Sequence, residues 1–187
     1  MNTSTLHPRP WTLPLAAPDA RDVLIRGSIL VALAFVLPAL THFLPWGNMG
    51  PLLMPLAIPV FLGAFLLPLP WALAAAITLP LASWALTGMP PMLPPVAPMM
   101  ILEGLATVAV VRALHRVTGD RLPLTLYILV GILANRVLAI AGLTLLFGMS
   151  FQASLAGAAL GIAGLSLNLI AIPLLVRLFA GRGESSS

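Results

Sequence analysis

Long apolar segments alternate with short polar or proline-rich breaks along most of the chain. A helix needs about 20 apolar residues to cross the ~30 Å hydrocarbon core of a bilayer. Six segments approach or reach this length, and they span residues 23–45, 52–67, 71–87, 98–117, 124–147 and 153–179. The Pro68-Leu69-Pro70 break predicts a tight turn between the short second segment and the third, although these two could also form a re-entrant pair. The pattern predicts an all-α integral membrane protein, a bundle of six transmembrane helices.

The composition is typical of a membrane domain rather than a soluble one. Of the 187 residues, 60% are hydrophobic and 7% are charged, and the mean hydropathy is +1.07. Soluble domains carry about 25% charged residues. We expect the membrane domain over residues 23–180, with a flexible tail over 1–22 and a short tail over 181–187. Prolines interrupt the first tail, so it lacks the apolar core of a signal peptide.

The positions of the arginines predict the topology. Arginines precede the first segment, flank the turn between the fourth and fifth, and follow the sixth (Arg9, Arg21, Arg26, Arg112, Arg116, Arg121, Arg177 and Arg182). The connections after the first, third and fifth segments contain no charge. With six spans, all eight arginines fall on one side, and the positive-inside rule predicts that both termini are cytoplasmic. The chain has too few charges for a nucleic-acid-binding patch.

A proline-rich, uncharged loop lies between the third and fourth segments. Five prolines fall between positions 90 and 98, and the first charge after them is Glu103. Because proline restricts the backbone, such a loop can hold one shape with little entropy left to lose on binding. The loop is either a stiff connector at the membrane surface or part of an external binding site.

Two charges are predicted to lie inside the membrane. Glu103 falls ~8 Å below the outer end of the fourth span, and Arg136 falls ~16 Å below the outer end of the fifth. Charges at such depth usually face a partner or an interior cavity, and they often mark a functional site. We therefore expect Glu103 and Arg136 to pair, or to face one polar cavity together. The pair is either a structural lock or a ligand contact.

Four further residues complete the candidate binding set. His42 and Asn48 lie near the outer end of the first span, Trp84 near the outer end of the third and Met100 at the start of the fourth. Trp84 is either an interfacial anchor or a stacking surface for a ligand. Asn135 and Asn168 are assigned to helix packing. No second histidine stands at metal-ligand spacing, so neither a metal nor another cofactor is expected.

Small residues and missing motifs indicate a binding protein rather than an enzyme. Ser28 and Ala32 are four residues apart on the first span, and Ala153, Gly157 and Gly161 follow the same spacing on the sixth. Such rows allow close helix contacts with a partner protein or within the chain. The sequence has no phosphate-binding loop, no nucleophile-elbow motif and no series of acidic residues for a proton path.

Three stretches are similar to the substrate-binding S components of energy-coupling factor (ECF) vitamin transporters. The first, Met54 to Arg116, resembles the family's proline-entered second span, its third span, a TGMPP loop and a glutamate-bearing fourth span. The second, "LYILVGILANRVLAIAG", resembles the fifth span with its central arginine, and the third, "GIAGLSLNLIAIPLLVRLF", resembles the closing span. Two positions differ from the family pattern, since Ser28 replaces the first alanine of an alanine pair and Ala57 stands where relatives often have histidine.

The resemblance implies a membrane protein of the bacterial cytoplasmic membrane that binds a vitamin or related micronutrient from outside. It also implies association with a transmembrane coupling subunit and two ATPase subunits, with Ser28 and Ala32 facing the coupling subunit. The substrate-binding residues would be His42, Asn48, Trp84, Met100, Glu103 and Arg136. Two other functions remain open: a structural membrane scaffold of the rod-shape-determining type, and a standalone small-solute facilitator.

Overall fold

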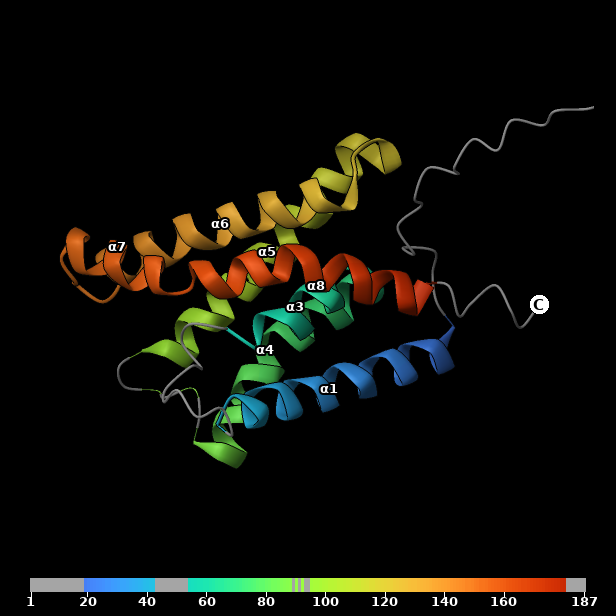
Figure 1. Ribbon diagram of the computed structural model, residues 1–187, viewed down its shortest axis with the longest axis horizontal. Helices are drawn as coiled ribbons and strands as arrows, with labels where there is room; N and C mark the ends of the chain where they lie inside the picture. Colours follow the sequence, from blue (N-terminus) through green and yellow to red (C-terminus); the bar gives the residue numbers. More distant parts are fainter. Residues whose placement is uncertain (1–18, 43–53, 89, 91, 93–94, 181–187) are drawn as a thin grey trace, which may run out of the picture.

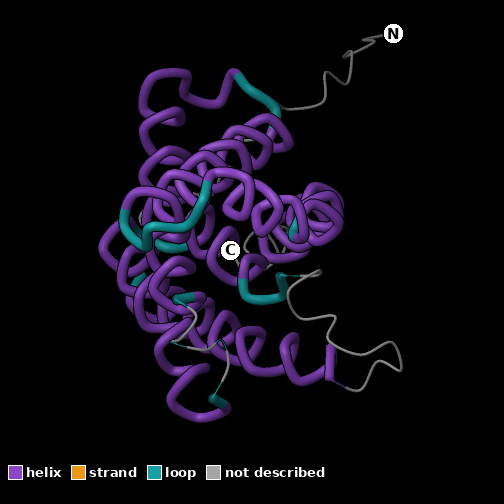
Figure 2. The backbone as a smooth tube through the Cα atoms, turned by 90° about the vertical axis from the view of Figure 1, so that its left-hand side faces the viewer, coloured by secondary structure: helices purple, strands orange, loops and turns teal. Residues whose placement is uncertain are grey.

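The computed structural model describes residues 19–42, 54–88, 90, 92 and 95–180, and every regular element in them is helical (Figures 1 and 2). The elements are α1 (Ala20–His42), α3 (Ala57–Leu66), α4 (Leu69–Thr87), α5 (Val96–Thr118), the short 3-10 helix η1 (Gly119–Arg121), α6 (Leu124–Leu145), α7 (Phe151–Leu160) and α8 (Ile162–Ala180). Both tails fall mostly outside these residues, as do Asn48 and part of the proline-rich loop.

Five helices are long and apolar enough to cross a membrane, namely α1, α4, α5, α6 and α8. The expectation of an all-helical, multi-pass membrane protein is therefore confirmed. The expected count of six full-length spans is not confirmed. Over its described residues, 54–67, the second predicted span forms the 10-residue helix α3, which at 1.5 Å per residue is about 15 Å long, half of a bilayer core. The sixth predicted span is divided at Gly161 into α7 and α8.

The short helix α3 forms the centre of the core. Every residue of α3 from Ile58 to Leu66 is buried, and α3 packs against α1, α4, α5 and α8 (Figure 1). Phe61 and Phe65 are almost fully buried, and they join a single apolar cluster with side chains of α5, α6 and α8. The burial explains why α3 shows no polar face: an apolar stretch too short to span the bilayer is stable here because protein surrounds it on all sides.

Two arginines bond the carbonyl groups at the end of α3. Arg26 Nη1 donates a hydrogen bond to the Leu66 carbonyl oxygen at 3.1 Å, and Arg112 Nη2 donates one to the Leu67 carbonyl oxygen. The last carbonyls of a helix have no partner within the helix and carry partial negative charge, so cations stabilise them. The predicted tight turn follows immediately, because α4 already begins at Leu69.

The described arginines other than Arg136 gather at one end of the bundle. The start of α1, the end of α8 and the turn between α5 and α6 lie together at that end (Figure 1). They carry Arg21, Arg26, Arg112, Arg116, Arg121 and Arg177. This clustering follows from helix lengths and connections, and it agrees with the charge asymmetry expected from the sequence.

Candidate functional site

The two deep charges of the sequence meet between α5 and α6. Arg136 Nη2 lies 3.5 Å from Glu103 Oε2, which is the expected ion pair. Glu103 is 7% exposed, so its carboxylate is almost fully removed from the surroundings of the bundle. The next residue, Gly104, lets α5 approach α3 and α4, since a Cβ there would lie 3.2 Å from Val60 Cγ1 and from Ala76 Cβ. Close packing of α5 against α3 and α4 thus fixes the backbone next to Glu103.

Asn135, adjacent to Arg136 in α6, completes a triad. Its Oδ1 accepts hydrogen bonds from Arg136 Nη2 at 2.6 Å and from Arg136 Nε at 3.1 Å. Arg136 therefore bonds both the Asn135 amide and the Glu103 carboxylate, and it links the three side chains. A buried polar network of this kind is rigid, and it loses much of its stability when one member is removed.

The guanidinium also contacts the break between α7 and α8. Arg136 Nη1 donates to the Ala158 carbonyl oxygen at 3.1 Å, in the last turn of α7. A Cβ on Gly161 would lie 3.2 Å from the same Nη1 and would clash with Met54 Sδ, so a larger residue here would displace these two side chains. The break leaves carbonyls of α7 without partners in a helix, and Arg136 bonds one of them. This interaction stabilises the break that divides the predicted sixth span.

Met54 covers the other side of the guanidinium. Its Sδ lies 3.6 Å from Arg136 Nη2. Met54 has a φ of 44°, a value that is rare for a residue other than glycine and costs free energy. The backbone just before α3 is thus held in an unfavourable conformation at the position where the Met54 side chain reaches Arg136. Such local strain is common at functional sites.

The other predicted binding residues do not join this cluster in the described part of the structure. Met100 is partly buried against the small apolar cluster of Ala34, Leu56 and Leu79. Trp84 is 40% exposed near the end of α4. The side chain of His42, at the end of α1, and all of Asn48 lie outside the described residues. The ligand-binding role of all six residues stays a prediction.

The predicted partner surface on α1 is open. Ser28 and Ala32 are both exposed on this helix. Leu24 and Val31 lie near them and are 68% and 46% exposed. The face is therefore a continuous surface of small and apolar side chains, available to lipid or to another protein.

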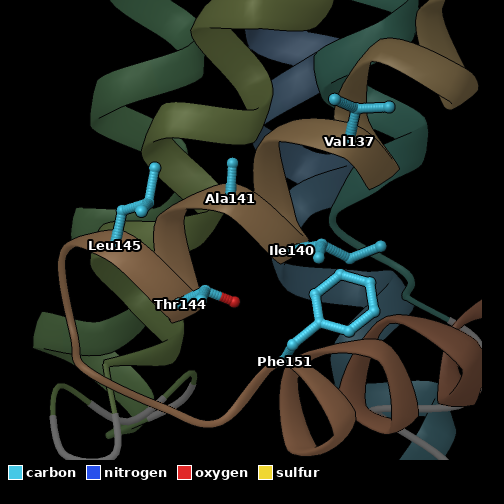
Figure 3. A pocket seen from close by; sticks show the side chains of 6 residues that line it. All are labelled: Val137, Ile140, Ala141, Thr144, Leu145 and Phe151. Carbon is cyan, nitrogen blue, oxygen red and sulfur yellow. The ribbon is translucent and has the colours of Figure 1, made fainter.

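A groove on the outside of the bundle is separate from the triad. Figure 3 shows it between α6 and α7, with Phe151 beside Ile140. The lining is apolar apart from Thr144, whose hydroxyl is hydrogen-bonded to Ser154 at 3.0 Å. The groove offers no charged group to a ligand, so the triad is the better candidate for recognising a polar molecule.

Sequence reasoning missed two contributors to the site and misassigned one. Asn135 was expected to pack helices, yet it is the main partner of Arg136. Its position next to an intramembrane arginine is the sequence feature that could have predicted this role. Met54 and the Ala158 carbonyl carry no sequence signal for this role, since they reach Arg136 only through the fold. Among the described residues there is no group of three potential metal ligands.

A comparison with protein-family models, curated proteins and solved structures finds no match for this chain.

Proposed function

We propose that this protein is the substrate-binding S component of an ECF-type importer, which captures a vitamin or related micronutrient from outside the bacterial cytoplasmic membrane. It would deliver the substrate together with a transmembrane coupling subunit and two ATPase subunits. Both termini would be cytoplasmic. The order and spacing of the three stretches that resemble this family support the proposal, as does the all-helical, multi-pass architecture.

The observation that carries the proposal is the buried triad of Glu103, Asn135 and Arg136. It lies among apolar helices, with Glu103 near the end of α5 away from the arginine-rich end and Arg136 near the middle of α6. Ionisable groups at such depth usually serve transport or binding. A carboxylate or phosphate on the substrate would replace the Ala158 carbonyl as an acceptor for Arg136, because guanidinium groups bond these anions at two points. Glu103 would hold Arg136 in place or accept a hydrogen bond from the substrate.

A structural scaffold is the second candidate, and one specific observation favours it. Protein groups already occupy Nε, Nη1 and Nη2 of Arg136. An arginine bonded in this way can lock α5, α6 and α7 together without any ligand. A scaffold needs partner surfaces such as the open face of α1, but it needs no substrate.

The decisive experiment is to identify small molecules that co-purify with the full-length protein by mass spectrometry, followed by thermal-shift titration with each one. An S component should retain a vitamin-like molecule, and Arg136→Ala should abolish the thermal shift. Arg121→Ala is a matched control, because it removes an arginine at the opposite end of the bundle. The proposal is wrong if no ligand shifts the unfolding temperature, or if Arg136→Ala leaves both ligand affinity and protein abundance unchanged. Transport without any ATPase partner would instead identify a facilitator.

A further inference from the structure

Three arginines gather where the buried helix α3 ends. Arg26 and Arg112 donate to the successive carbonyl oxygens of Leu66 and Leu67, so their guanidinium groups are close neighbours. Arg116 follows Arg112 by one helical turn on α5, and its charge acts on Arg112. Three positive charges therefore share one corner of the bundle, formed by α1, α3 and α5.

This arginine cluster, Arg26, Arg112 and Arg116, is poorly compensated. Asp22 Oδ2 lies 3.6 Å from Arg26 Nη2, but its side chain is 51% exposed, so solvent screens this pair. Arg112 Nε is buried and has no hydrogen-bond partner in the part of the chain that the structure describes. Buried donors almost always have a partner, because an unpaired one is costly. The cluster thus carries excess positive charge, and the guanidinium of Arg112 is incompletely bonded.

The cluster lies at the depth of a membrane surface. Trp71, in the first turn of α4, comes four residues after Leu67 and is 56% exposed. Exposed tryptophans are typical of the boundary between lipid tails and water. Apolar side chains on the same helices face outward, including Leu24 and Ile25 on α1. A molecule bound at the arginines would therefore have lipid tails beside it.

We propose that Arg26, Arg112 and Arg116 bind the phosphate group of an anionic phospholipid. Guanidinium groups match phosphate oxygens in geometry as well as charge. Phosphate oxygens would accept from the guanidinium groups, and the negative charge would offset the repulsion among the three arginines. The lipid would hold the ends of α1 and α5 against the turn between α3 and α4. This proposal does not depend on the proposed transport function.

The test measures lipid binding to the purified full chain by native mass spectrometry. The probes are dioleoylphosphatidylglycerol and dioleoylphosphatidylcholine, which have the same acyl chains but differ in headgroup charge. We expect the anionic lipid to be retained preferentially. Arg116→Gln should weaken that binding about fivefold, the effect of one arginine near an anionic membrane surface. Arg116 is chosen because Arg112 also bonds the Leu67 carbonyl, so its loss would disturb the fold.

Arg121→Gln is the matched control, since it removes the same charge from the same end of the protein. It should change the affinity for phosphatidylglycerol less than twofold. Equal losses in the two variants would show general surface attraction and overturn the site. Equal retention of the two lipids would also overturn it. A third arm adds inorganic phosphate: if phosphate displaces phosphatidylglycerol at similar concentration, the ligand is free phosphate and the lipid assignment is wrong.

Discussion

Glu103 and Arg136 should be strongly coupled in the stability of this protein. Their charged atoms lie 3.5 Å apart, and their side chains are 10% and 15% exposed. At this distance, with an effective dielectric constant of about 20, the attraction between two unit charges is about 5 kcal/mol. The cost of removing both charges from water offsets part of this attraction. A net coupling free energy of about 1–3 kcal/mol is therefore expected.

The perturbation is a double-mutant cycle with Glu103→Gln and Arg136→Gln. Arg136→Gln alone should cost about 3–5 kcal/mol, because it leaves Glu103 buried without a cation. It also removes the hydrogen bonds to Asn135 and the Ala158 carbonyl. Glu103→Gln should cost less, because glutamine keeps an acceptor and nearly the same shape. The double variant should be more stable than the sum of the two single effects predicts, by the coupling free energy.

Equilibrium unfolding in mixed detergent micelles provides the measurement, with the four tryptophans as fluorescence reporters. A second cycle combining Glu103→Gln with Arg121→Gln is the control, and its effects should add. If the effects of Glu103→Gln and Arg136→Gln also add to within about 0.5 kcal/mol, the charges do not stabilise each other and the triad is not a unit.

Two further substitutions test the core, and a third serves as a control. Gly131→Ala should destabilise the protein by about 1–3 kcal/mol, because the new Cβ would lie 2.9 Å from Phe61 Cε1; Gly157→Ala, whose Cβ would meet only Leu143 Cδ1 at 3.9 Å, should be close to neutral in the same unfolding assay. Asn168→Leu should stabilise the protein by about 1 kcal/mol or more, since both polar atoms of this fully buried amide lack a partner among the described residues. A lower unfolding midpoint for Asn168→Leu would show that the amide has a partner in the native state.

Sequence reasoning found the charged part of the site but not its geometry. Composition requires that Glu103 and Arg136 lie in an apolar environment, and the cost of isolated charges there makes their pairing the natural expectation. The acceptors on Asn135 and Ala158 could not be predicted in the same way. An asparagine can bond many neighbours, and a backbone carbonyl becomes an acceptor only where the fold interrupts a helix.

The helix lengths, too, could be predicted from the sequence only in part. Hydropathy placed every apolar segment, because transfer from water to lipid depends only on the local run of side chains. It could not show that the second segment is a buried half-length helix, since apolar residues facing protein and apolar residues facing lipid look alike in sequence. Nor could it show the break at Gly161, where the glycine has no side chain to clash with Met54.

The sequence by itself determined that this is an all-helical membrane protein, with the arginines other than Arg136 expected at one end and two charges at depth. These properties follow from local hydrophobicity and from the free energy of burying charge. Only the tertiary structure decided that α3 is central, that Arg26 and Arg112 bond its last carbonyls, and that Asn135 joins the deep charges. Those contacts link residues far apart in the chain, such as Arg112 and Leu67, which are 45 positions apart, and they depend on how the helices pack.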